Sequence, residues 1–375
     1  MTGRPKARRL PAPPQLLPSQ QHSVPFFPLV LLLAFVLVAA TALLAAGCGS
    51  GTATTTAATA TTVTSSAAGP GAADTSTTGA ATGATTPTTG AAGQTAATGT
   101  FPVTIKDDDG INVTIKAKPA RIVSTKPAST EILFAIGAGD RVVGVSSLDD
   151  YPPQVKNIAK VGDFEPNPEA VMGLSPDLVV SYSGYEEKLQ AVQAAGAAVL
   201  TFNPVSVEGI FANITALGVA TGNTGQAAAL VDSLKTQIAQ ISAAAKATGS
   251  APEVFYAVDN TLYTIGPNTF VDDLLKMANA VNVASMLGNN ANGQQYYQYS
   301  PEQLVAADPD IILLPTSSGY KNIQEFTKDP RFAQMTAVKG GQVFLIDDTT
   351  ITRPGPRIAE GLKILVKAIH PDAAL

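Results

Sequence analysis

A gapless internal repeat constrains the fold of this chain more than any other feature. Residues 167–181 read NPEAVMGLSPDLVVS and residues 300–314 read SPEQLVAADPDIILL; four positions are identical and the aliphatic positions match. Each copy starts with a helix-capping residue, continues with Pro and Glu in the first helical turn, and ends in an aliphatic strand. The repeat predicts two lobes built alike, each a small sheet flanked by helices.

Short aliphatic segments alternate with helical patterns in both halves. A hairpin is expected first, with Asp109-Gly110 at its turn. Strands are then expected at 121–125, 142–146, 178–182, 199–202, 254–258, 262–265, 311–314 and 343–346. Helical patterns fall between them, for example at 129–136, 186–195, 270–277 and 357–369. Strands and helices that alternate at this spacing predict parallel βα units.

One long helix is predicted between the two halves. Residues 225–247 contain no Pro and no internal Gly, and their apolar side chains recur every three or four residues. The stripe consists of Leu230, Leu234, Ile238, Ile241 and Ala245. A helix of this length measures about 35 Å, long enough to cross from one lobe to the other.

The first 47 residues have the pattern of an export signal. A basic start is followed by 23 uncharged, mainly apolar residues at 24–46, enough for either a signal peptide or a membrane span. Small residues precede the single cysteine, Cys48, and this arrangement resembles a bacterial lipobox, in which the thiol is lipidated after cleavage. The alternative is an uncleaved transmembrane anchor. Both place the rest of the chain outside the cytoplasm, attached to the membrane.

A linker is predicted at residues 48–100. Its residues 49–100 include 19 Thr, 15 Ala and 9 Gly, with Val63 as the single large aliphatic residue. Such a segment cannot bury enough apolar surface to offset the entropy of ordering. As a random coil it would span about 40 Å. The folded domain is therefore expected at residues 101–375.

The composition of that domain argues against several function classes. It carries 20 Lys and Arg against 28 Asp and Glu, so nucleic acid is an unsuitable partner. One cysteine excludes an intramolecular disulfide and a Cys-based metal site. His370 is its single histidine, which disfavours catalytic triads and sites for bare Zn²⁺ or Mn²⁺. We expect no catalytic residues, no bound metal ion, no cofactor and no enzymatic activity.

The remaining polar and aromatic residues suit binding, with ordinary packing as the alternative for each. Aromatic rings on loops of a rigid scaffold suit large planar ligands. The aromatic candidates are Tyr151, Phe164, Tyr182, Tyr185, Tyr263, Tyr296, Tyr297 and Tyr299. Arg353 and Arg357 precede the last helix, where a cation opposes the helix dipole, so a compensating acid or a ligand is expected there. Glu169 and Glu302 either stabilise their helices or form a symmetric pair of anionic contacts for a two-fold partner.

Several segments together resemble one family. They are Arg121–Phe164 (RIVSTKPASTEILFAIGAGDRVVGVSSLDDYPPQVKNIAKVGDF), the two repeat copies, and Thr352–Leu362 (TRPGPRIAEGL). Taken in this order, they resemble the periplasmic binding proteins of cobalamin and iron-siderophore ABC importers. The resemblance covers essentially residues 101–375. Asp149-Asp150-Tyr151-Pro152-Pro153 looks more like the cobalamin branch, although the chain has no Trp.

The resemblance implies an α/β fold of two Rossmann-like lobes bridged by a single long helix, the class III periplasmic-binding-protein fold. Lobe 1 would cover about residues 101–222, the bridging helix 223–248 and lobe 2 residues 252–375. A ligand held between the lobes would contact the predicted site residues, which are Tyr151, Phe164, Tyr182, Tyr263, Tyr296, Tyr297, Arg353 and Arg357. Glu169 and Glu302 match the family's glutamates that dock onto permease arginines.

The function implied is that of a membrane-tethered receptor. A monomer, lipidated at Cys48 on the outer face of the bacterial cell membrane, would capture cobalamin or a related corrinoid and deliver it to a permease dimer with its ATPase subunits. The alternatives are a ferric-siderophore or haem receptor of the same family, or a non-transport extracytoplasmic sensor. In either receptor the ligand arrives with its metal already chelated.

Overall fold

The computed structural model describes residues 100–287 and 295–375. The predicted leader at residues 1–47, Cys48 and all but the last residue of the predicted linker lie outside the described residues. Within these two ranges, no helix is both long enough and apolar enough to cross a membrane.

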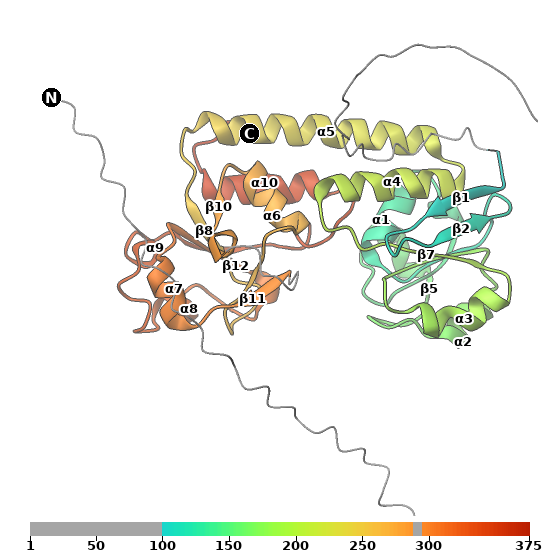
Figure 1. Cartoon of the computed structure of the whole chain (residues 1–375), viewed down its shortest axis with the longest axis horizontal. Helices are drawn as coiled ribbons and strands as arrows, with labels where there is room; N and C mark the ends of the chain where they lie inside the picture. Colours follow the sequence, from blue (N-terminus) through green and yellow to red (C-terminus); the bar gives the residue numbers. More distant parts are fainter. Residues whose placement is uncertain (1–99, 288–294) are drawn as a thin grey trace, which may run out of the picture. The chain divides into compact units, whose positions relative to one another are not determined.

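Lobe 1, drawn in teal to green in Figure 1, contains a five-stranded parallel sheet in the order β5-β4-β3-β6-β7. Its strands are β3 (Ile122–Ser124), β4 (Val142–Val145), β5 (Ala159–Lys160), β6 (Leu178–Ser181) and β7 (Ala198–Thr201). Its helices are α1 (Pro127–Ala135), α2 (Pro168–Gly173), α3 (Glu186–Ala194) and α4 (Val207–Thr221). The expected hairpin precedes the sheet as β1 (Val103–Lys106) and β2 (Asn112–Ile115).

Lobe 2 contains a four-stranded parallel sheet in the order β10-β8-β12-β13. Its strands are β8 (Glu253–Tyr256), β10 (Val281–Asn282), β12 (Ile311–Pro315) and β13 (Val343–Ile346). Its helices are α6 (Phe270–Met277), α7 (Pro301–Ala307), α8 (Gln324–Thr327), α9 (Thr336–Lys339) and α10 (Ile358–Ile369). A separate two-stranded ribbon pairs β9 (Tyr263–Ile265) with β11 (Tyr296–Gln298).

The two sheets have the same topology, apart from the extra edge strand β5. In each sheet the first strand (β3 or β8) lies between the second strand (β4 or β10) and the strand of the repeat (β6 or β12), which in turn pairs with the last strand (β7 or β13). The carboxylate of Asp177, just before β6, accepts hydrogen bonds from the backbone N–H groups of Ala120 and Arg121 at 2.8 and 2.9 Å. The carboxylate of Asp310, just before β12, accepts one from Glu253 at 2.8 Å. The repeated Pro-Asp therefore ties the repeat to the start of the neighbouring strand in both lobes.

The backbone between helix and strand also repeats. Ser175 and Asp308, at equivalent positions, both take left-handed φ values, 44° and 42°. This conformation is uncommon for residues other than glycine, so its recurrence shows that both loops turn in the same way. The prediction of two lobes built alike is confirmed.

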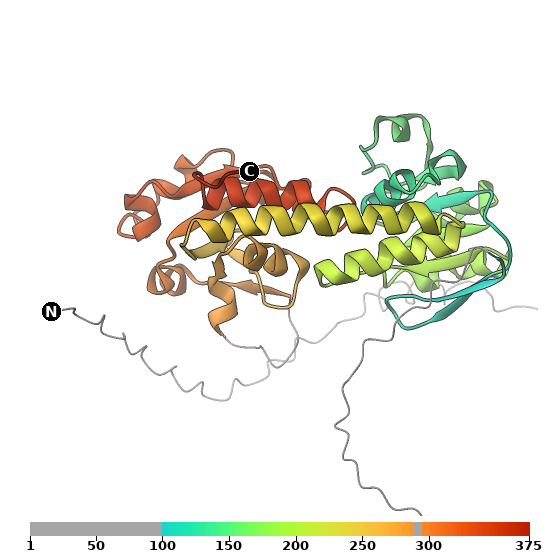
Figure 2. The same ribbon diagram turned by 90° about the horizontal axis from the view of Figure 1, so that it is seen from above.

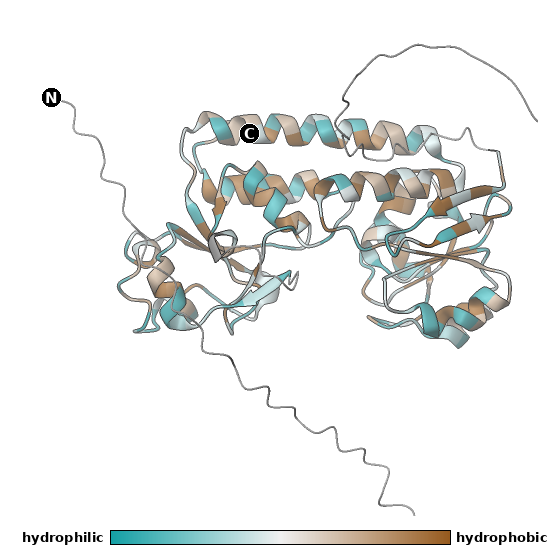
Figure 3. Cartoon of the chain, viewed as in Figure 1, coloured by the Kyte–Doolittle hydropathy of each residue, from teal (hydrophilic) through white to brown (hydrophobic). Residues whose placement is uncertain are grey.

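The long helix is α5 (Thr224–Ala247), which packs on α4 of lobe 1 and on α10 of lobe 2 (Figures 1 and 2). Leu234, Ile238 and Ala245 of the predicted stripe are buried. Helix α4 was not among the expected elements. It is apolar on most of its surface, as Figure 3 shows, and ten of its residues are buried. The described residues thus form two α/β lobes joined by one long helix.

Candidate ligand site and docking surface

The carboxyl ends of the lobe 1 strands bring together residues that are far apart in the sequence. Lys126 lies two residues after β3, Tyr151 follows β4 in a short loop, and Tyr182 comes directly after β6. In parallel α/β sheets, ligands bind outside these strand ends. This edge of lobe 1 is therefore the candidate ligand surface.

Lys126 is buried among these strand ends and was not among the predicted site residues. Its Nζ donates to the carbonyl oxygen of Phe202 at 2.5 Å, beyond the end of β7, and lies 4.6 Å from the ring centroid of Tyr182. Burial lowers the pKa of the lysine to about 8. Lys126 therefore contacts the ring of Tyr182 at the strand ends. The ring and the Phe202 carbonyl cover its ammonium group.

Asp149 is a buried acid in the same loop as Tyr151. Neither of its carboxylate oxygens has a hydrogen-bond partner. Thr130 is nearby, but its hydroxyl donates to Ser124 Oγ at 2.8 Å. Burial raises the pKa of Asp149 to about 6, and the charges of Lys160 and Arg353 offset part of this rise.

The segment before α10 reaches lobe 1 and is held there by ion pairs. Arg357 donates to both oxygens of Glu131 on α1, and its guanidinium lies 4.1 Å from the ring centroid of Tyr151. Arg353 donates to Glu131 at 3.1 Å and to both oxygens of Asp150. The side chain of Glu131 is 1% exposed and that of Asp150 60% exposed. Glu131 and Asp150 are therefore the compensating acids that the two arginines require.

The two acids differ in how accessible their carboxylates are to a ligand. Glu131 is enclosed, whereas the exposed Asp150 carboxylate faces solvent as well as Arg353. The guanidinium of Arg353 holds the pKa of Asp150 below its ordinary value, so this ion pair stays charged at neutral pH. Counted together, the two arginines and the two acids carry no net charge.

In lobe 2, the strand ends are joined by Asp348, which follows β13. Its carboxylate accepts hydrogen bonds from the hydroxyl of Thr316 and from the N–H and hydroxyl of Ser317, all just after β12. Tyr256, the last residue of β8, is buried, and its hydroxyl has no partner. Burial raises the pKa of Tyr256 well above its ordinary value.

The register of the β9–β11 ribbon determines which face of the ribbon each tyrosine occupies. Tyr263 pairs with Gln298 and Tyr296 with Ile265, so Tyr263 and Tyr296 lie diagonally on one face. Tyr297 pairs with Thr264 and points to the opposite face, where it is half-buried. Tyr299 is core: it is buried against Phe255 in an edge-to-face contact at 5.5 Å. One of the three clustered tyrosines is thus structural.

Phe164 is the most exposed large apolar side chain in the described ranges, at 68%. It lies three residues before Asn167, which caps α2. Tyr297 lies three residues before Ser300, which caps α7, so the two aromatic residues occupy equivalent positions of the repeat. Both residues are predicted ligand contacts, and their equivalence becomes evident when the repeat is extended by three residues toward the N-terminus.

The predicted residues thus fall into three groups. Tyr151, Tyr182, Arg353 and Arg357 gather at the strand ends of lobe 1, where Arg357 contacts Tyr151, the two arginines share Glu131, and Tyr182 contacts Lys126. Tyr263, Tyr296 and Tyr297 lie on the ribbon of lobe 2, and Phe164 lies before α2. Glu131 and Asp150 were not singled out; the expectation that the arginines need an acid was the one available signal.

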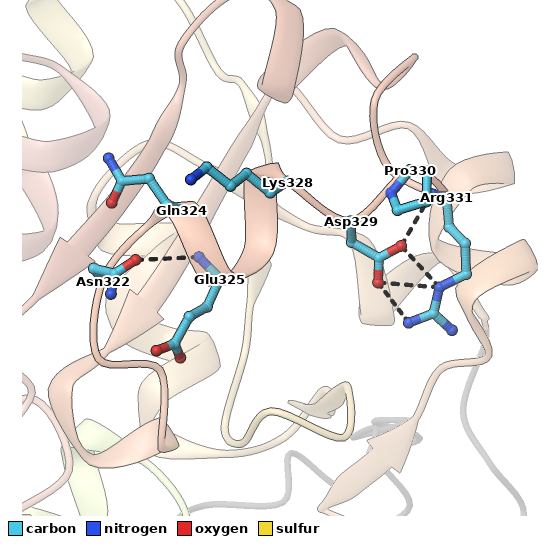
Figure 4. A pocket seen from close by; sticks show the side chains of 7 residues that line it. All are labelled: Asn322, Gln324, Glu325, Lys328, Asp329, Pro330 and Arg331. Carbon is cyan, nitrogen blue, oxygen red and sulfur yellow. Dashed lines mark hydrogen bonds and ion pairs between the residues drawn. The ribbon is translucent and has the colours of Figure 1, made fainter.

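An open pocket of about 710 Å³ lies elsewhere on lobe 2 (Figure 4). It is lined by α8 and the loop that follows, where Asp329 holds the guanidinium of Arg331 at 2.6 Å. None of the predicted ligand residues lines it. The strand ends gather aromatic and charged groups from both halves of the chain and remain the candidate ligand surface.

The two predicted docking glutamates are exposed at equivalent places. Glu169 is in the first turn of α2, where Asn167 Oδ1 accepts from the N–H of Ala170. Glu302 is in the first turn of α7, where Ser300 and Gln303 form a capping box. Hydrogen bonding to its own N–H lowers the pKa of Glu302, which keeps this carboxylate charged.

Comparisons with known proteins agree with this architecture. Residues 122–350 match the family model described as periplasmic binding protein. The uncharacterized ABC transporter substrate-binding lipoprotein YvrC of Bacillus subtilis is 37% identical over 284 residues, covering 73% of this chain and 88% of that protein. A cobalamin-binding protein of Halobacterium salinarum is 30% identical over 280 residues, covering 72% and 75%.

Solved structures show the same fold. A possible iron-binding (periplasmic solute-binding) protein of Staphylococcus epidermidis matches with a TM-score of 0.61 at 29% identity, covering 68% of this chain and 99% of that one. The periplasmic heme-binding protein RhuT of Roseiflexus sp. RS-1, in its apo form, matches with a TM-score of 0.60 at 28% identity, covering 67% and 98%.

Proposed function

Because this chain belongs to the periplasmic binding protein family and has its class III fold, we propose that it is the substrate-binding protein of an ABC importer that captures cobalamin or a related corrinoid. It binds the ligand at the strand ends and passes it to a permease dimer with ATPase subunits. It performs no reaction. Support comes from the family match and from the relatives named as a substrate-binding lipoprotein and a cobalamin-binding protein.

One observation favours a corrinoid over an anionic chelate. Arg353 and Arg357 are both compensated by Glu131 and Asp150, and Lys126 is covered by Tyr182 and Phe202. The site therefore offers aromatic side chains and a neutral ion-pair cluster rather than free cations. A large ligand without net negative charge fits such a surface. Its burial does not carry the desolvation penalty of an anion that finds no cationic partner in the site.

The second candidate is a ferric-siderophore or heme receptor. The observation that favours it is the exposure of Asp150, because a carboxylate of the ligand could replace Asp150 on Arg353 while Arg357 stays bound to Glu131. Two of the matched structures are named iron-binding and heme-binding. An extracytoplasmic sensor built on the same fold would bind ligand without importing it.

Titration separates these candidates. The full chain is titrated with cyanocobalamin, hemin and a ferric carboxylate chelate (ferric citrate), and binding is followed by absorbance and tyrosine fluorescence. We expect cyanocobalamin to bind at micromolar concentration or tighter. Binding of hemin or the ferric chelate alone would select the second candidate, and no binding to any of the three would contradict the transport function.

The docking role of Glu169 and Glu302 has its own test. Replacing both with Ala should leave ligand affinity unchanged and abolish uptake by cells. Glu187→Ala with Glu360→Ala is the matched control, because both residues are exposed first-turn glutamates outside the repeat. A loss of ligand affinity in the Glu169 and Glu302 variant would contradict docking.

The remaining segments complete the proposal. Residues 1–47 would be a lipoprotein signal peptide, Cys48 the lipidated residue that anchors a monomer to the outer face of the membrane, and 48–100 a tether. Lobe 1 would cover about 101–222 and lobe 2 about 252–375, with the bridging helix at 223–248. Mass spectrometry of the membrane-extracted chain tests the anchor: a diacylated N-terminal Cys48 is expected, and an intact leader would contradict it.

A further inference from the structure

Two exposed apolar side chains occupy equivalent positions of the repeat. Met172 on α2 is 39% exposed and Val305 on α7 is 37% exposed. Each lies three residues after the glutamate of its helix, Glu169 or Glu302. Residues three apart are neighbours on a helix surface, so each lobe presents a carboxylate with an apolar side chain beside it.

Burial of another face of each helix leaves these residues at the surface. Val171 and Leu304 are also equivalent in the repeat, and both are fully buried in the cores of their lobes. Met172 and Val305 follow these residues, about 100° further round the helix, and their side chains remain exposed. A polar residue at either position would satisfy the same fold, because neither side chain is needed in the core.

Chance exposure does not explain the pair well. Single apolar side chains are common on protein surfaces and need no explanation. Among the exposed large apolar residues of the described ranges, however, Met172 and Val305 alone are related by the repeat. Both lobes therefore keep an apolar residue at the one position beside the glutamate.

The two helices differ in what surrounds the glutamate and its apolar neighbour. Arg331 approaches Glu302 closely enough for each to affect the pKa of the other, and Asp329 holds the Arg331 side chain in place (Figure 4). In lobe 1, Met172 lines an open pocket of about 730 Å³ together with Ser175 and Asp177. The carboxylate and the apolar neighbour are thus what the two sites share.

We propose that Met172 and Val305 are the apolar half of a two-site docking surface, whose charged half is Glu169 and Glu302. The partner is a membrane protein made of two like subunits, each presenting a guanidinium beside an apolar side chain. The anionic glutamates select the cation, and the apolar contacts are buried around the ion pair and exclude water from it. This inference rests on the proposed function, because it takes the permease dimer as the partner.

The apolar contacts would add to the affinity for the permease dimer, to which exposed ion pairs alone contribute little. Exposed ion pairs contribute little because water screens them, whereas removal of apolar surface from water is favourable at each site. We expect each polar substitution to weaken docking about three- to tenfold, and the two together about ten- to a hundredfold.

The experiment uses the full chain, expressed in its own cells in place of the wild-type copy. Met172→Gln with Val305→Thr is compared with Met172→Leu with Val305→Ile, which keeps the apolar character. Val205→Thr with Leu345→Gln is the control, because both residues are exposed apolar residues outside the repeat. Uptake of cyanocobalamin and of hemin is measured in cells, and affinity for both and thermal unfolding are measured on the purified chains.

We expect the Gln and Thr variant to bind ligand and unfold like the wild type but to lose at least tenfold in uptake, while the other two variants import normally. Unchanged uptake by this variant, with uptake abolished in the Glu169 and Glu302 variant, would overturn the apolar contacts and leave the proposed function intact. A loss of ligand affinity or of stability in the Gln and Thr variant would also overturn them. Failure of the wild type to bind either ligand would contradict the proposed function itself.

Discussion

Arg357 is joined to Glu131 by two hydrogen bonds, from Nε to Oε2 at 2.8 Å and from Nη2 to Oε1 at 2.5 Å. The two residues are 226 positions apart in the chain. Glu131 belongs to α1 of lobe 1, and Arg357 immediately precedes α10, which packs on the bridging helix. This ion pair therefore fastens the returning chain to the first lobe, beside the strand ends that form the candidate ligand surface.

Glu131→Gln should destabilise the protein strongly. The neutral amide would leave two partly buried guanidinium groups without their shared acid, and breaking a buried pair in this way costs about 3–5 kcal/mol. Urea unfolding measures the change in the free energy of unfolding. Glu208→Gln is the control: it removes an exposed pair with Lys235 and should cost about 1 kcal/mol or less. Equal effects of the two substitutions would contradict the role of Glu131.

Asp149→Asn should change how stability depends on pH. Since burial raises the folded-state pKa of Asp149 from 3.8 to about 6, the folded state binds more protons than the unfolded state between these values. Stability contributed by this group is therefore lost as pH rises from about 4 to about 6. The variant should be more stable than the wild type at pH 7 by about 1–3 kcal/mol, and this advantage should vanish near pH 4.

Thermal unfolding between pH 4 and pH 8 checks this prediction. Asp150→Asn serves as the comparison, because Arg353 lowers the pKa of Asp150 and removal of that carboxylate should not stabilise the protein at neutral pH. A pH-independent difference between Asp149→Asn and the wild type would show that Asp149 does not titrate in this range.

Gly218→Ala should disturb the packing of α4 on the bridging helix. A Cβ at Gly218 would lie 2.4 Å from the Cβ of Ala227 on α5, well inside contact distance. Overpacking of this kind costs about 1–3 kcal/mol. Ala227→Gly removes the clashing atom, so adding it to Gly218→Ala should restore part of the lost stability. If the two losses simply add in the double variant, the close approach is not the cause.

Phe164→Ala and Tyr297→Ala should each weaken ligand binding. The two rings occupy equivalent positions before α2 and α7, and an aromatic contact contributes about 0.5–1.5 kcal/mol beyond its buried area, so affinity should fall by at least about two- to tenfold. Isothermal titration with cyanocobalamin measures the change. Phe164→Tyr should retain affinity, and Ile111→Ala, at an exposed position of the β1–β2 turn, should have no effect. Unchanged affinity in both Ala variants would exclude these rings from the site.

Much of the architecture follows from local patterns. The repeat predicts the two matching sheets because helix caps and buried strands are encoded by neighbouring residues, and α5 was expected from its stripe within one residue of its observed bounds. Helix α4 was missed because its apolar residues surround most of the helix and show no clear periodicity. The aromatic candidates for the ligand site could be named from the sequence, but their roles in binding stay predictions.

The sequence by itself determined the fold class, the repeat, the bridging helix and the positions of the acids proposed for docking, since each depends on patterns of residues close together in the chain. Tertiary structure alone decided which side chains are covered. Asp149 is buried and its neighbour Asp150 is exposed, while Tyr299 is core and Tyr297 is not. Burial, and with it the pKa of an acid or the partner of an arginine, depends on elements that meet only when the chain is folded.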